Sequence, residues 1–72
     1  MSKRQVKKIR KIDIQLERVH RVVMKAKKEG KKHIDYIEIA VKLEISPTYA
    51  RELLKLYARI HGLTYSWGRL LL

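Results

Sequence analysis

The feature that most restricts the fold of this chain is the pair Ser46-Pro47, which precedes a run of apolar and charged residues at helical spacing. A serine hydroxyl caps a helix by accepting a hydrogen bond from a free first-turn amide, and proline suits the first helical position because its missing N–H costs nothing there. A helix is therefore predicted over residues 47–60, with Gly62 ending it. Its core-facing stripe has residues three and four apart: Ala50, Leu53, Leu54 and Tyr57.

A second, shorter helix is predicted just before this one, within residues 33–44. Asp35 is expected to cap it, with Glu38 completing a capping-box pattern. Its predicted buried stripe is Ile37, Ala40, Val41 and Leu43, with Tyr36 and Ile39 at the edges. Ile34 lies in a very short strand or simply leads into the helix. Because only Glu44 and Ile45 separate this helix from Ser46, the two helices must cross steeply.

The first third of the chain predicts a longer amphipathic helix that ends at Gly30. Its apolar positions also form an a/d heptad stripe: Ile9, Ile12, Leu16, Val19, Val23 and Ala26. Asp13 is an alternative cap, which would leave residues 9–12 outside the helix. Residues 1–8 carry no pattern. We therefore predict a flexible basic arm over residues 1–11 and one folded domain over residues 12–72.

Charge is the strongest property of the whole chain, which has 18 Lys and Arg against 7 Asp and Glu and a formal net charge of +11. The excess is concentrated in residues 1–32, with thirteen basic and three acidic residues, whereas residues 33–72 hold five and four. Such a field attracts polyanions, meaning nucleic acid or an anionic membrane surface. The N-terminal part is expected to supply most of this attraction.

Several classes of protein are disfavoured by what the 72 residues lack. There is no cysteine, and the three histidines, His20, His33 and His61, are too scattered in the sequence for a ligand cluster, so neither a metal nor a cofactor is expected. No glycine-rich phosphate loop or nucleophile–base set is present, so an enzyme is not expected. The apolar runs are far shorter than the about 20 residues of a membrane-spanning helix. We expect a cytoplasmic, nucleoid-associated protein with no membrane partner.

Residues 36–57, YIEIAVKLEISPTYARELLKLY, resemble a helix-turn-helix motif. Ala40 matches the small residue of the motif's first helix. The apolar positions of the motif are matched by Ile39, Leu43, Ile45, Ala50 and Leu53. The turn position that the motif usually gives to glycine is occupied here by Glu44.

Residues 63–72, LTYSWGRLLL, are compatible with a short β-hairpin that turns at Trp67-Gly68. Helix, helix-turn-helix and hairpin together resemble a minimal winged helix domain. The resemblance implies a mostly α fold, in which a three-helix helix-turn-helix core carries a short C-terminal β-hairpin.

The winged helix resemblance implies that the helix after Ser46 enters the major groove of duplex DNA, where Arg51 would offer two donors to guanine and Thr48 would meet a thymine methyl group or a phosphate. The candidate DNA-binding residues of this helix and its cap are Ser46, Thr48, Tyr49, Arg51, Glu52, Lys55 and Arg59. Those outside it are Lys42 in the preceding helix, Tyr65, Trp67 and Arg69 in the hairpin, and Lys3, Arg4, Lys7, Lys8, Arg10 and Lys11 in the arm. The arm lysines and arginines would attract phosphates without regard to sequence.

Simpler interpretations of these residues remain open. The basic side chains of the 47–60 helix can be an ordinary solvated face, and Glu52 between them weakens their field. Tyr49 can pack against the first helix instead of reaching DNA. Trp67 can cover the small core, which needs large apolar residues.

Three functional classes are compatible with the sequence. The first is a sequence-preferring duplex DNA-binding protein, a small transcriptional regulator or a DNA-coating protein. The second is a structural RNA-binding or ribosome-associated protein, and the third is a protein-interaction subunit of a larger nucleic-acid-processing complex. In addition, the heptad stripe favours a homodimer paired through the first helix, since Ile9 and Ile12 would otherwise have little to cover them.

Overall fold

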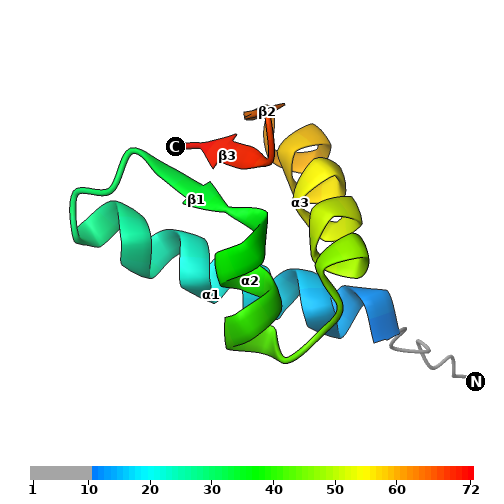
Figure 1. The fold of residues 1–72 in the computed structure, drawn as a ribbon. Coiled ribbons are helices and arrows are strands. Elements are labelled where there is room, and N and C mark those ends of the chain that lie inside the picture. Colours follow the sequence, from blue (N-terminus) through cyan, green and yellow to red (C-terminus); the bar gives the residue numbers. More distant parts are fainter. Residues whose placement is uncertain (1–10) are drawn as a thin grey trace, which may run out of the picture.

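The structure, a computed structural model, describes residues 11–72 (Figure 1). It has three helices and one small sheet, with one strand between the first two helices and two strands after the third helix. The elements are α1 (Lys11–Lys28), β1 (His33–Asp35), α2 (Tyr36–Leu43), α3 (Pro47–His61), β2 (Thr64–Ser66) and β3 (Arg69–Leu71). The predicted mostly α fold with a C-terminal hairpin is confirmed. The predicted arm residues Lys3, Arg4, Lys7, Lys8 and Arg10 lie outside the described residues, whereas Lys11 is helical.

Helix α1 includes Asp13 in its first turn, so a start capped by Asp13 is not what forms. The helix ends as predicted at Gly30, whose φ of 82° lies in the left-handed region. The Lys31 amide donates to the Ala26 carbonyl at 2.9 Å and the Gly30 amide donates to the Lys27 carbonyl at 3.0 Å. These two bonds satisfy carbonyls that the last helical turn would otherwise leave unpaired.

The corner between α2 and α3 is built as the sequence predicts. The Ser46 hydroxyl accepts from the Tyr49 amide at 3.1 Å, and Pro47 is the first residue of α3. Glu44 takes a left-handed conformation, with φ 57° and ψ 48°, and it is followed by an Ile45 amide that donates to the Ala40 carbonyl at 3.0 Å. This geometry is the one that favours glycine at the turn of the motif.

The predicted cap of α2 forms, but the capping box does not. The Asp35 carboxylate accepts from the Ile37 amide at 3.2 Å. Glu38 does not reach back to the cap, because its carboxylate lies 2.9 Å from Lys31 Nζ and 4.0 Å from Lys42 Nζ. These lysines offer Glu38 a charged partner, which is stronger than a neutral backbone amide.

The predicted buried stripe of α2 is right for Ala40 and Leu43 and wrong for Ile37 and Val41. Ile39 is fully buried, together with Ala40 and Leu43, whereas Ile37 is 46% and Val41 is 71% exposed. Apolar residues occupy almost every position of this eight-residue helix, so periodicity alone could not select the face that turns inward.

The sheet is antiparallel with the strand order β1-β3-β2. The hairpin of β2 and β3 turns at Trp67-Gly68 as predicted, and both residues have positive φ, 53° and 78°, as in a type I′ turn. The third strand is β1, which pairs with β3 and not with its neighbour in sequence. Ile34 therefore lies in a strand, opposite Leu70.

One core lies between the three helices and the inner face of the sheet. Its largest fully buried side chains are Val19 and Val23 of α1, Ile34 of β1, Ile39 of α2, Leu53 and Leu54 of α3, and Leu70 of β3. Burial of each such side chain contributes about 1.5–3 kcal/mol. Because every element except β2 contributes one of them, the core fixes α3 against both α2 and the sheet and leaves the outer side of α3 free.

Candidate functional site

The outer side of α3 is polar and exposed. Helical spacing places Thr48, Glu52, Lys55 and Arg59 opposite the buried stripe of this helix. Lys55 Nζ lies 3.9 Å from the Glu52 carboxylate, and both side chains are more than half exposed. Such a pair is worth little and is easily exchanged for a ligand phosphate. The face therefore has a net positive charge that a polyanion can reach.

Arg51 lies on the flank of α3 that turns toward the sheet. Its guanidinium carbon stands 5.4 Å from the centre of the Tyr36 ring, which is a cation–π distance. The Tyr36 ring in turn covers Gly68, where a Cβ atom would come within 3.0 Å of it. The Tyr36 amide also donates to the Gly68 carbonyl at 2.9 Å. Tyr36 thus joins the Arg51 flank and the tip of the hairpin into one surface.

Trp67 is 97% exposed at the tip of the β2–β3 hairpin, which projects at the top of the molecule as seen in Figure 1. The alternative in which this indole covers the core is therefore wrong. Leu70 and the half-buried Tyr36 close the core at this end, so the Trp67 side chain points outward from the turn. Arg69 on the neighbouring strand is also exposed.

Two predicted contacts, Tyr49 and Tyr65, are half-buried against the core. Tyr49 lines a groove beside α1, which agrees with the alternative that this side chain packs against the first helix. The Tyr65 hydroxyl is buried and has no hydrogen-bond partner among residues 11–72. Burial raises the pKa of Tyr65 above 10.0, and the nearby positive charge of Arg51 partly offsets this rise. Neither tyrosine presents its ring with Thr48 and Arg51.

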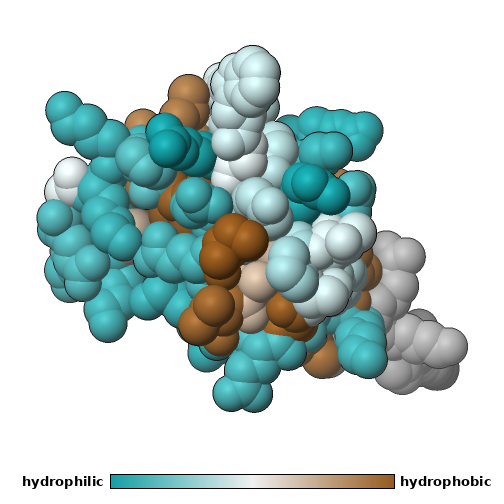
Figure 2. Space-filling model, viewed as in Figure 1, coloured by the Kyte–Doolittle hydropathy of each residue, from teal (hydrophilic) through white to brown (hydrophobic). Residues whose placement is uncertain are grey.

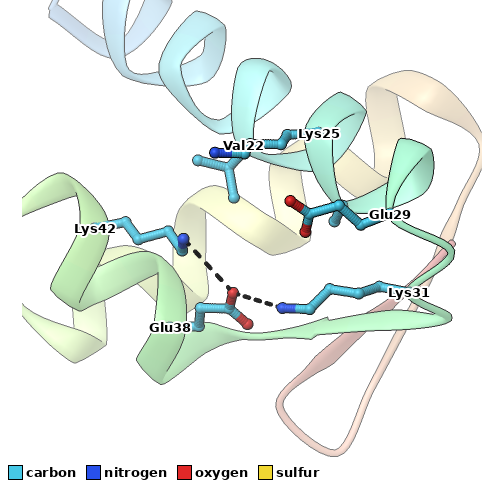
Figure 3. A pocket seen from close by; sticks show the side chains of 7 residues that line it. Val22, Lys25, Glu29, Lys31, Glu38 and Lys42 are labelled. Carbon is cyan, nitrogen blue, oxygen red and sulfur yellow. Dashed lines mark hydrogen bonds and ion pairs between the residues drawn. The ribbon is translucent and has the colours of Figure 1, made fainter.

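Lys42 extends away from α3, toward α1. Figure 3 shows it beside Glu38, at the edge of a pocket of about 100 Å³ between α1 and α2 that also includes Lys25, Glu29 and Lys31. Three lysines and two glutamates meet there, and Glu38 accepts from Lys31 while it pairs with Lys42. The alternating charges make this pocket a structural link between α1 and α2 and a poor site for an anion.

The fold brings together two histidines that are far apart in the sequence. His20 of α1 and His61 of α3 stack with ring centroids 5.6 Å apart. His20 Nδ1 lies 2.6 Å from the Tyr57 hydroxyl, whose pKa burial raises above 10.0. The cluster ties α1 to α3. No group of three or more metal-binding side chains occurs within residues 11–72.

Two apolar surfaces lie outside the core. Over α2, where Ile37 and Val41 are exposed, apolar residues gather at the front of the view in Figure 2. Between the N-terminal end of α1 and α3 there is a groove of about 350 Å³ with an apolar floor. The floor consists of Ile12, Tyr49, Leu53 and Leu56, and Glu52, Lys55 and Arg59 form its rim.

The candidate site is thus the outer side of α3, its Arg51 flank and the hairpin tip. Comparison of the chain with protein-family models, curated proteins and solved structures gave no match. Within residues 11–72 no helix is both long and apolar enough to span a bilayer.

Proposed function

We propose that this protein binds duplex DNA in the manner of a winged helix, with α3 in the major groove and with a preference for sequence. The observation that carries the proposal is the exposed basic side of α3, which Tyr36 joins to the projecting hairpin. The two surfaces would contact neighbouring parts of one duplex. The basic residues of the predicted arm would add attraction along the phosphates.

Arg51 is the residue proposed to read sequence. Its guanidinium offers paired donors that fit the O6 and N7 atoms of guanine, and its contact with Tyr36 holds it without neutralising its charge. Lys55 and Arg59, one and two turns farther along the exposed side, are proposed to contact phosphates. Thr48, at the start of the helix, is placed for a thymine methyl group or a phosphate.

The proposal is tested by fluorescence anisotropy of labelled random duplexes, genomic fragments and structured RNA over a range of salt concentrations. The expected result is tighter binding to some duplexes than to others and to RNA, with an affinity that falls steeply as salt rises. Arg51→Ala should weaken binding and remove the preference. Arg51→Lys should keep most of the affinity but lose the preference, because an ammonium group lacks the paired donors.

Arg21→Ala is the matched control, since Arg21 is an exposed arginine of α1 that pairs with Glu17 at 3.5 Å. It should lower affinity only slightly and leave the preference intact. Equal affinity for every duplex, unchanged in Arg51→Ala, would show general DNA coating in place of sequence reading. Tighter binding to structured RNA than to any duplex would select the RNA-binding alternative.

A protein-interaction role is a second candidate, and the observation that favours it is the apolar outer side of α2. Ile37 and Val41 lie one turn apart on this helix and are both exposed. A DNA-binding surface gains nothing from these side chains. If this role is the main one, Val41→Asp should abolish stable co-purification with a larger partner while leaving the helical content of the chain unchanged.

The homodimer remains a proposal for only one end of α1. Val19 and Val23 of the heptad stripe are at most 1% exposed inside one chain, so a coiled coil along the whole helix cannot form without unfolding the core. We propose that two copies pair instead through Ile14, which is 51% exposed near the N-terminal end of α1 and does not line the groove beside α3. Light scattering should give twice the mass of the chain, and Ile14→Glu should reduce it to the mass of one.

A further inference from the structure

Trp67 occupies a position where its side chain contributes nothing visible to the fold. It is the only tryptophan of the chain, and it is 97% exposed. Its φ of 53° lies in the left-handed region, which is unfavourable for a bulky side chain and which type I′ turns normally give to asparagine or glycine. A large apolar ring held in this way on the surface points to a ligand contact.

The backbone that carries the indole is held at a defined place. Gly68 next to it is covered by the Tyr36 ring, and the Gly68 carbonyl accepts from the Tyr36 amide at 2.9 Å. The strands on either side of the turn are paired, with Ser66 opposite Arg69, and Arg69 is opposite Asp35 of β1. Because the turn is anchored on both sides, its backbone loses little conformational freedom when the ring meets a ligand.

The chemistry of this tip favours a nucleobase. The ring is flat and nearly all of its surface is free, so a second flat ring can stack on it. Arg69 is exposed on the adjoining strand and Arg51 lies beyond Tyr36, so the surroundings suit a strand that carries phosphates. Base–aromatic stacking of this kind is the usual way in which proteins hold unpaired strands.

Bases inside a duplex are not available for such stacking, because both of their faces are covered by their neighbours. The minor groove is only about 6 Å wide and exposes base edges instead of faces. We propose that Trp67 stacks on an unpaired base that adjoins the duplex held by α3, so that the ligand is a duplex with a single-stranded extension. This inference rests on the proposed duplex binding by α3.

Trp67 supplies its own probe, because no other residue contributes tryptophan fluorescence. The full chain is titrated with a blunt duplex, with the same duplex carrying a 5′ or a 3′ extension, and with the single strand alone, while a dye on the far end of the duplex reports total binding by anisotropy. Duplexes with one of the two extensions should quench the emission and bind about 5- to 150-fold more tightly than the blunt duplex. The blunt duplex should bind with much weaker quenching, because it offers the indole no exposed base face.

Two variants separate stacking from folding. Trp67→Asn places in the turn a residue that accepts positive φ, so the melting temperature should rise or stay the same while the preference for the extended duplex disappears. Trp67→Phe keeps a smaller ring and should retain part of the preference. In both variants, affinity for the blunt duplex should fall less than affinity for the extended duplex, because α3 holds the duplex itself.

Equal binding of blunt and extended duplexes, or equal quenching by both, would overturn the inference while the proposed duplex binding stands. Quenching by the single strand without any binding of the blunt duplex would overturn the proposed function and leave the stacking contact. Anisotropy unchanged by every nucleic acid would overturn both. A blue shift of the emission on anionic vesicles, with no response to extended duplexes, would assign the indole to a membrane surface and overturn the inference.

Discussion

Glu44→Gly should stabilise the protein, and the structure indicates by how much. Glu44 holds φ 57° and ψ 48° at the end of α2, a conformation that costs a residue with a Cβ atom about 1–2 kcal/mol. Glycine avoids this cost but loses more conformational entropy on folding, about 0.5–1 kcal/mol. The carboxylate also lies at the negative end of the helix dipole, which costs an exposed group about 0.3 kcal/mol or more. The net gain is expected to be about 1 kcal/mol.

The gain is measured by thermal and urea unfolding followed by circular dichroism. For a domain of this size, about 1 kcal/mol raises the melting temperature by roughly 4–8 °C. Glu44→Gln is the matched control, because it removes the charge but keeps the Cβ atom. It should recover only the electrostatic part, about 0.3 kcal/mol.

Equal stability of Glu44→Gly and Glu44→Gln would show that the strain of the left-handed conformation at this turn is no larger than the entropy that glycine loses, about 0.5–1 kcal/mol. A Glu44→Gly variant that is less stable than the natural chain would refute the reasoning altogether. Either result would also remove the physical basis for the match between Glu44 and the glycine of the helix-turn-helix motif.

Three further predictions concern stability. Ser46→Ala removes the hydroxyl that caps α3 and should cost about 1 kcal/mol in urea unfolding, whereas Ser46→Asp should restore most of it. Leu54→Ala empties a site with no exposure and should cost about 2–5 kcal/mol, enough to unfold a domain whose core supplies roughly 3–5 kcal/mol, as amide dispersion in NMR spectra would show. Tyr65→Phe removes a buried hydroxyl without a hydrogen-bond partner among residues 11–72 and should stabilise the fold by about 1 kcal/mol near neutral pH. Burial raises the pKa of Tyr65, so the fold favours the neutral phenol over the phenolate. This contribution to the free energy of unfolding is present below about pH 10 and is lost as pH rises through the raised pKa. Between about pH 9 and about pH 11, the melting temperature of Tyr65→Phe should therefore fall less than that of the natural chain.

Local chemistry made much of the fold predictable. The caps at Asp35 and Ser46, the glycine ends at Gly30 and Gly62, and the hairpin turn at Trp67 each depend on a few neighbouring residues, and all of them form. Such signals need no knowledge of the tertiary structure.

Non-local contacts account for what the sequence did not predict. The inward face of α2 is chosen by what surrounds it, since the helix is apolar on nearly all sides. The pairing of β1 with β3 joins strands separated by two helices, and no local signal specifies it. The same is true of the stack between His20 and His61, which exists only because α1 crosses α3.

For the candidate site, spacing predicted the exposed face of α3 but not the roles of its aromatic neighbours. A hydrophobic pattern does not distinguish Tyr49 and Tyr65 from Trp67, yet the two tyrosines are half-buried and the tryptophan is almost fully exposed. The pairing of Tyr36 with Arg51 and Gly68 depends on side-chain placement across three elements. Sequence periodicity holds no information on these contacts.

The most direct test of the account is to locate the DNA-binding surface residue by residue. Amide NMR spectra of the full chain, labelled with ¹⁵N, are recorded as a duplex carrying the preferred site is added. The largest shifts are expected in residues 46–55 of the cap and first half of α3 and in residues 66–69 of the hairpin tip, with small shifts around the stacked His20 and His61. Shifts confined to the outer side of α2 around Val41, or to the lysines at the end of α1, would contradict this expectation.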